Sequence, residues 1–151
     1  MHIERDDLTR YEVLRLLADH MVDMHATSPA ESVHALDLSG LRRSDVTMWT
    51  LWDDGVLLGC AALRELSPDA GEIKSMRTVA EARGRGLGRL LLEHVITEAR
   101  GRGYRRLCLE TGTEDFFAPA RRLYERNGFT ECPPFGDYSL DPHSIYLTRE
   151  L

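Results

Sequence analysis

VAEARGRGLGRLL, residues 79–91, places three glycines and three arginines between an apolar, strand-like run and an amphipathic, helix-like run. Glycine allows the backbone to approach a ligand closely, and the first turn of a helix carries amide groups that have no partner within the helix. A turn of this kind is suited to bind an anion. A phosphate group is therefore the ligand that we expect at this position.

The length and composition of the chain limit what it can be. Its 151 residues suffice for one domain of ordinary size, and we expect a single domain over residues 1–151. No apolar stretch approaches the length of a membrane span, and the charged N-terminus lacks the apolar segment of a signal peptide. The three cysteines show no paired spacing, which favours reduced thiols. We therefore expect a cytoplasmic protein that does not bind a membrane.

The charge of the chain is unevenly distributed. The formal net charge is −6, yet residues 83–106 contain seven arginines and only two acidic residues, a local net charge of +5. A basic segment in an otherwise acidic protein suits a compact polyanionic ligand, because a long nucleic acid would require a broader basic surface. We therefore expect no nucleic-acid partner.

The hydrophobic pattern predicts two helices and a hairpin, followed by alternating strands and helices. We expect helices at 11–25 and 28–38, a hairpin at 45–66 turning at Asp54-Gly55, strands at 70–79, 104–111 and 144–151, and helices at 87–100 and 119–127. A strand, a helix and a strand at this spacing imply a right-handed parallel crossover. The sequence therefore predicts an α/β (α+β) fold, with a mixed central β-sheet flanked by helices on both faces.

Two common phosphate-binding motifs do not match the glycine-rich turn. A dinucleotide fingerprint starting at Gly84 would need a third glycine where Arg89 stands. A P-loop would need a lysine followed by serine or threonine after its last glycine, and neither is present. The turn therefore belongs to another class of phosphate site.

The pattern Arg83-x-x-Gly86-x-Gly88 resembles the R/Q-x-x-G-x-G/A motif of the GCN5-related N-acetyltransferases, the GNAT family. A later helix is similar to the family pattern A-x-x-L-Y-x-x-x-G-F, here Ala120, Leu123, Tyr124, Gly128 and Phe129. The resemblance covers about residues 71–129, and the segments SPAESVHALDL, EIKSMRT, LETG and PPFGDY resemble a subgroup of small acetyltransferases. It implies a GNAT fold and an enzyme that transfers the acetyl group of acetyl-CoA directly to a primary amine of a small molecule or peptide. The alternative is a non-catalytic regulatory module that binds CoA or acetyl-CoA.

The resemblance also implies where acetyl-CoA binds. The backbone amides of the turn would hold the pyrophosphate, and the arginine side chains would supply positive charge. The alternative is that these arginines form a solvated face at the start of the helix. The turn residues are Arg83, Gly84, Arg85, Gly86, Leu87, Gly88 and Arg89. The preceding strand would pair with the acetyl-pantetheine arm through Met76, Arg77, Thr78 and Val79. One position departs from the family, because Phe117 stands where many members carry an asparagine that contacts the cofactor.

Two residues are the catalytic candidates. Glu72 resembles the strand glutamate that serves as general base in several family members, and the alternative is an exposed carboxylate at a strand end. Tyr124 is placed by its motif to protonate the departing CoA thiolate, and the alternative is an aromatic residue of the core.

The acceptor site is less well defined by the sequence. Glu110, at the end of the adjacent strand, could be a base, a partner of the substrate ammonium group or a helix-cap acid. His34 could bind substrate or be an ordinary half-buried histidine. Of Trp49 and Trp52, which should face opposite sides of a strand, we expect one in the core and the other at a pocket or dimer contact. A homodimer is left open, and no histidine or cysteine spacing indicates a metal.

Overall fold

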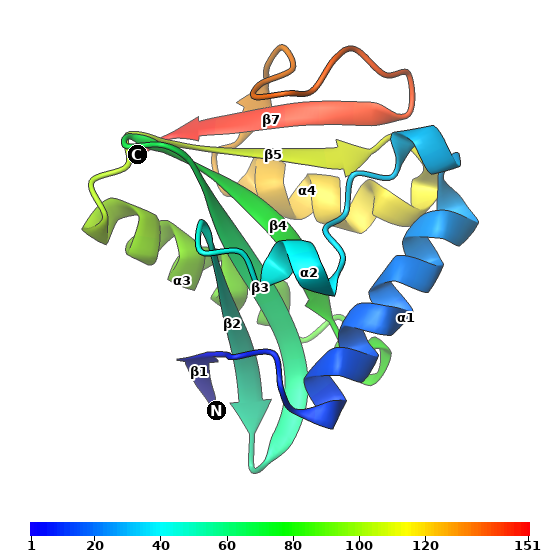
Figure 1. Ribbon diagram of the computed structural model, residues 1–151, viewed down its shortest axis with the longest axis vertical. Coiled ribbons are helices and arrows are strands. Elements are labelled where there is room, and N and C mark those ends of the chain that lie inside the picture. The colour runs from blue at the N-terminus through cyan, green and yellow to red at the C-terminus, as the bar shows by residue number, and fades with distance from the viewer.

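Seven strands form one mixed β-sheet through the middle of the computed structural model, which describes residues 1–151 (Figure 1). Their order across the sheet is β1-β2-β3-β4-β5-β7-β6. The strands are β1 (His2–Arg5), β2 (Val46–Asp53), β3 (Val56–Ser67), β4 (Ala70–Thr78), β5 (Arg106–Gly112), β6 (Thr130–Glu131) and β7 (Ser144–Glu150). Neighbouring strands are antiparallel except β4 and β5, which are parallel. The expected mixed sheet and parallel crossover are confirmed.

Helices cover both faces of this sheet, as predicted (Figure 1). α1 (Tyr11–Thr27) and the short α2 (Leu38–Leu41) lie on one face, whereas α3 (Leu87–Gly101) and α4 (Ala118–Arg126) lie on the other. Short 3₁₀ turns occur at η1 (Ala30–Ser32), η2 (Ala80–Ala82) and η3 (Asp115–Phe117). A buried apolar cluster lies between each pair of helices and the sheet, so the core has two layers.

The two tryptophans of β2 belong to different layers of this core. Trp49 packs in the cluster under α3, and Trp52 packs in the cluster under α1, so the rings face opposite sides of the sheet as their spacing predicts. Both are almost fully buried, at 4% and 5% exposure. The expectation that one of them lines a pocket or a dimer contact is therefore wrong.

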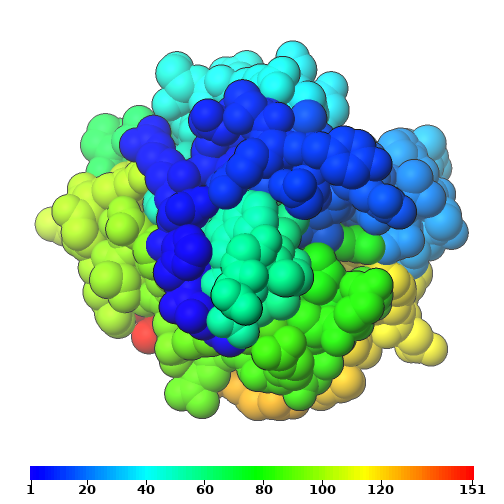
Figure 2. Space-filling view, turned by 90° about the horizontal axis from the view of Figure 1, so that it is seen from below, coloured from blue at the N-terminus to red at the C-terminus, as the bar shows by residue number.

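The hairpin between β2 and β3 turns where the sequence places it. Asp54 and Gly55 both have positive φ, at 49° and 77°, which is the conformation that two-residue hairpin turns require. Viewed from below, α1 in blue and the chain around the end of β4 in green lie on either side of this hairpin (Figure 2). The hairpin thus forms one end of the molecule, between the N-terminal helix and the glycine-rich turn.

Two parts of the predicted element order are wrong. The strands β1 and β6 were not expected, and residues 28–38 form the turn η1 and an extended segment that leads into α2, not one helix. β1 is short and charged, and it exists through its pairing with β2 at the edge of the sheet. The 28–38 segment is held from outside, because Lys74 Nζ donates to the carbonyl oxygen of His34 at 2.9 Å. Non-local pairing therefore decides both regions.

Candidate active site

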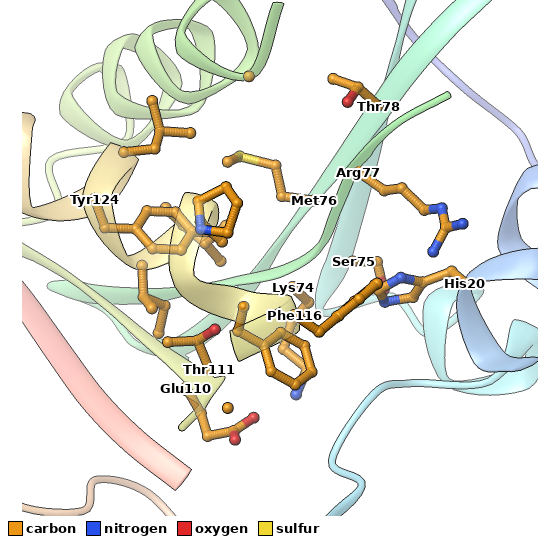
Figure 3. A pocket seen from close by; sticks show the side chains of 18 of the residues that line it. His20, Lys74, Ser75, Met76, Arg77, Thr78, Glu110, Thr111, Phe116 and Tyr124 are labelled. Atoms are coloured by element: carbon orange, nitrogen blue, oxygen red, sulfur yellow. The ribbon is translucent and has the colours of Figure 1, made fainter. Parts of the chain in front are cut away.

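A cavity of about 1120 Å³ opens where β4 and β5 separate. The two strands pair only over Ala70–Glu72 and Arg106–Cys108, and beyond these residues they diverge. One end of the cavity, which we call the arginine end, is lined by Arg83, Gly84, Gly86, Gly88, Arg89 and Arg126. The other end, the α1 chamber, is lined by residues that include His20, His34, Lys74, Ser75, Arg77 and Glu110 (Figure 3).

The arginine end is built on backbone amides that have no acceptor in the protein. α3 begins at Leu87 without a side-chain cap, after Gly84 and Gly86 adopt left-handed φ values of 78° and 77°. None of the amides from residue 84 to residue 89 donates a backbone hydrogen bond, and the next amide, that of Leu90, donates to Gly86 O at 3.3 Å. Consecutive free N–H groups at a helix start can hold an anion such as phosphate.

The space beside these amides is open. A Cβ atom on Gly84 or Gly86 would meet no heavy atom of the protein within 4 Å. The arginines at 83, 85 and 89 are exposed, and the first and last of them line the cavity. Arg85 does not line it, and the side chain of Leu87 is buried in the core beneath α3. At positions 85 and 87 the turn can therefore contribute to the cavity only through its backbone amides.

β4 presents a free backbone edge to the cavity. Ser75 has a φ of 49°, and the register with β3 shifts here, so that Ser75 and Met76 together lie opposite Ala61. This is a β-bulge, which bends a strand and disrupts its ladder. Met76, Arg77 and Thr78 line the cavity, and their pairing with an extended ligand stays a prediction. Val79 does not line it, because its amide donates to Leu58 O at 2.9 Å and its side chain packs into the core.

Tyr124 projects from α4 into the cavity opposite β4 (Figure 3). Its ring also packs on Phe129, with the ring centroids 5.8 Å apart, so the residue belongs to the core as well as to the cavity. Burial, and to a lesser extent the charge of Glu110, raises the pKa of the Tyr124 phenol. The phenol therefore stays protonated at neutral pH and can act as a hydrogen donor.

Glu72 lies beneath the 132–143 segment, outside the lining of the cavity. The Tyr138 hydroxyl donates to Glu72 Oε2 at 2.6 Å, and Lys74 Nζ approaches the same oxygen at 3.4 Å. The residue is only 1% exposed, so the alternative of an exposed carboxylate at a strand end is wrong. Its role as a base stays a prediction.

Glu110 is the carboxylate that lines the cavity. The Ser144 hydroxyl donates to its Oε2 at 2.8 Å, and burial is the main cause that raises the pKa of Glu110 above its ordinary value. Its carboxylate caps no helix, so that alternative is wrong. Glu110 is therefore the carboxylate at the cavity wall that can accept a proton.

The α1 chamber also contains groups that the sequence did not single out. His34 lines it as well, with its ring edge-on to that of Tyr138 and the ring centroids 5.1 Å apart, and its role in binding substrate stays a prediction. Lys74 donates to His34 O, to Tyr138 Oη and to Glu72, so it joins three separate segments. His20 and Ser75 complete the lining near α1. The helical spacing of His20 and the ordinary serine at 75 gave no signal for either position.

Phe117, which stands where the expected pattern has an asparagine, has a structural role of its own. Phe117 lines the cavity and packs directly on Gly112, where any Cβ would overlap its ring. The side chain therefore offers an apolar wall in place of an amide group. Phe116 beside it is 44% exposed at the same wall.

Comparisons with known proteins point in one direction. The family model described as "Acetyltransferase (GNAT) family" matches residues 11–129. A protein of Bacillus subtilis (strain 168), named uncharacterized N-acetyltransferase YsnE, is 49% identical over the full length of both chains. The crystal structure of a protein of Klebsiella pneumoniae assigned as an acyl-CoA N-acyltransferase has a TM-score of 0.84 and 29% identity, covering 99% of this chain and 97% of that one. A GNAT family acetyltransferase from Elizabethkingia anophelis with acetyl-CoA bound has a TM-score of 0.69 and 19% identity, covering 99% and 97%.

Proposed function

This chain belongs to the acetyltransferase (GNAT) family, and from that premise we propose that it transfers the acetyl group of acetyl-CoA directly to a primary amine of a small molecule or peptide. One observation carries the proposal. A single cavity joins free amides at a helix start, a free strand edge, a protonated phenol and a carboxylate with a raised pKa. These are the groups that acyl transfer from a phosphate-bearing thioester requires.

The residues of the cavity fit acetyl-CoA. The amides at 84–89, with Arg83 and Arg89 beside them, are suited to its pyrophosphate. The free edge of β4 beyond the bulge can pair with the amides of its pantetheine arm. When bound, the cofactor supplies an activated acetyl group as a thioester. No cysteine lines the cavity, which supports direct transfer without an acyl-enzyme.

The chain would supply a polarising group, a base and an acid. Backbone N–H groups of β4 that point away from β3 would polarise the carbonyl group that the amine attacks. The amine is a nucleophile only in its neutral form, so its ammonium form must first lose a proton, which a carboxylate at the cavity wall can accept. The Tyr124 hydroxyl would donate a proton to the departing sulfur.

Of the two glutamates, the geometry favours Glu110 as the group that meets the amine. Glu110 lines the cavity, whereas Glu72 is separated from it and already accepts from Tyr138. We therefore assign proton acceptance to Glu110 and a supporting role to Glu72. In that role its charge holds Lys74 and Tyr138, which in turn hold the wall of the chamber.

The experiment is an assay of acetyl-CoA-dependent thiol release with a panel of amines. Glu110→Gln should lower kcat by about 10²-fold or more, as expected for loss of a general base, while the Kd for acetyl-CoA stays unchanged. Glu72→Gln, as the comparison, should have a smaller effect on kcat. If Glu72→Gln abolishes turnover and Glu110→Gln does not, the assignment of the base is reversed. If no amine is acetylated by the wild-type enzyme, the proposed function is wrong.

A further inference from the structure

We infer that the acceptor carries a carboxylate close to its amine, and that Arg77 and Ser75 bind this carboxylate in the α1 chamber. The inference rests on the proposed function and specifies its substrate class, which is an amino acid or a similar compact amino-carboxylate. It follows from two unpaired polar atoms, from the state of the other basic side chains around them and from the position of Glu110.

Two neighbouring residues of the chamber have buried polar atoms without a partner. These atoms are Arg77 Nε and Ser75 Oγ, and both residues line the cavity. A buried donor that is left unpaired costs about 1–3 kcal/mol, so native proteins pair such groups with the chain, water or a ligand. Both unpaired atoms lie beside the strand edge where the acetyl group is expected. They therefore mark a place that a polar part of the acceptor can occupy.

The guanidinium group of Arg77 is only partly used. Its Nη2 donates to Asp23 Oδ2, an α1 carboxylate that is 37% exposed, at 2.6 Å. The Arg77 side chain itself is 12% exposed, and its Nε has no acceptor. Arginine is suited to carboxylates because its planar group donates from two edges, so one edge can hold Asp23 while the other binds a ligand. A serine hydroxyl next to that edge can donate to the second carboxylate oxygen.

The other groups of the chamber leave Arg77 as its available cation. Lys74 is already engaged by His34 O at 2.9 Å, Tyr138 Oη at 2.8 Å and Glu72 Oε2 at 3.4 Å. Burial, and then the charge of Arg77, lowers the pKa of His20 to about 4, so this ring is neutral at pH 7. It can therefore offer a hydrogen bond but no charge. An anion entering the chamber would be attracted by Arg77.

The proton acceptor lies away from this cation. Figure 3 shows Glu110 and Arg77 on different sides of the cavity, with Lys74 and Ser75 between them. An acceptor that places its amine at Glu110 can direct a nearby carboxylate toward Ser75 and Arg77. A simple amine would leave Arg77 Nε and Ser75 Oγ without a partner, and that difference provides discrimination between the two classes.

The first experiment compares matched acceptors with the wild-type enzyme. The pairs are L-phenylalanine with 2-phenylethylamine and L-leucine with 3-methylbutylamine, which differ by the carboxylate. We expect kcat/KM to be about 10-fold or more higher for each amino acid, since a buried hydrogen bond to a charged group contributes at least this factor. Equal or higher kcat/KM for the simple amines would overturn the inference and leave the proposed function intact.

The second experiment uses variants and a binding measurement. Arg77→Gln should reduce the preference for the amino acid to less than 3-fold, and Ser75→Ala should reduce it by a smaller factor. Arg64→Gln is the control, because Arg64 lies on the neighbouring strand β3 outside the lining of the cavity, with its Nε 3.5 Å from Asp45 Oδ2. It should leave the preference unchanged. An equal change in Arg77→Gln and Arg64→Gln would contradict the inference.

The binding measurement separates this inference from the proposed function. Calorimetric titration of N-acetyl-L-phenylalanine and of N-(2-phenylethyl)acetamide, each in the presence of CoA, needs no turnover. We expect the first compound to bind about 10-fold more tightly or better, and Arg77→Gln to remove the difference. If no amine is acetylated but this preference is found, the proposed function fails and the carboxylate site stands. If acetylation occurs but neither compound is preferred, the carboxylate site is refuted.

Discussion

Replacing Gly86 by alanine separates the cost of a strained backbone from the loss of an anion site. Gly86 has a φ of 77°, and a Cβ atom added there would meet no heavy atom within 4 Å. The stability cost is therefore the left-handed conformation alone, about 1–2 kcal/mol for a residue with a side chain. For a chain of this size we expect Tm to fall by about 2–8 °C.

The same methyl group would enter the open space beside the free amides at 84–89. An anion held there makes charge-assisted hydrogen bonds of about 1.5–3 kcal/mol each. Loss of one such bond weakens binding by about 10-fold to 150-fold. We therefore expect Gly86→Ala to raise the Kd for acetyl-CoA by at least about 10-fold, as measured by calorimetric titration.

Gly55 provides a closely matched control. Its φ is also 77°, a Cβ there also meets nothing within 4 Å, and it lies in the hairpin turn outside the cavity. Gly55→Ala should lower Tm by a similar amount and leave the Kd for acetyl-CoA unchanged. If the two variants bind acetyl-CoA equally well, the amides at 84–89 do not hold its phosphates and the reasoning about this turn is refuted.

Three further predictions concern the walls of the cavity. Tyr124→Phe should lower kcat by about 10²-fold, as for loss of a general acid, with the Kd for acetyl-CoA retained; an unchanged kcat in steady-state assays would exclude the acid role. The raised pKa of Glu110 means that the folded protein binds this proton more tightly than the unfolded chain, so ionisation of Glu110 lowers the free energy of unfolding as pH rises from 4.5 through the raised pKa. Urea titrations over this range should show a flatter pH dependence for Glu110→Gln than for the wild type, and parallel curves would contradict it. Gly112→Ala should lower the free energy of unfolding by about 1–3 kcal/mol, because the added methyl group overlaps Phe117. Gly101→Ala, whose methyl group would meet no atom within 4 Å, should not show this loss, and urea unfolding of both variants tests the difference.

The parts of the fold that the sequence predicts well are those fixed by local chemistry. Asp54-Gly55 specifies its turn because both residues tolerate positive φ, and the apolar stripe of residues 87–99 specifies α3 and its buried face. The short strands β1 and β6 were missed because neither has a pattern of its own, and each is stabilised by the strand beside it. Local patterns cannot indicate a strand whose only support is non-local.

The candidate site divides in the same way. The glycine-rich turn and Tyr124 could be placed from their motifs, because backbone conformation and helical spacing are written in a few adjacent residues. The burial of Glu72 under Tyr138 could not, since it depends on how the 132–143 segment crosses the sheet. A net charge of −6 gives no indication that a partly free arginine faces the acceptor space.

The bulge at Ser75 connects the two halves of the site. Side chains alternate along a strand, so Glu72 and Lys74 share one face and Ile73 packs on the other, beneath α3. Without the extra residue of the bulge, Met76 would lie on the same face as Lys74. Arg77 would lie on the same face as Ile73, in the apolar core. The bulge reverses this order, because Met76 packs with the core beneath α3 and Arg77 pairs with Asp23 of α1.

One irregularity in the backbone thus concerns both halves of the site. It lies just beyond the residues where β4 stops pairing with β5, beside the strand edge proposed to bind the cofactor arm, and it moves Arg77 from the core to the α1 side of the sheet. Ser75 tolerates its left-handed φ of 49° at a cost of about 1–2 kcal/mol, since it is not glycine. Strain of this kind persists where the surrounding structure enforces it, and here the Cys60 thiol donates to the Ser75 carbonyl at 3.2 Å. The proposed position of the acetyl group and the proposed recognition of the acceptor therefore depend on the same residue.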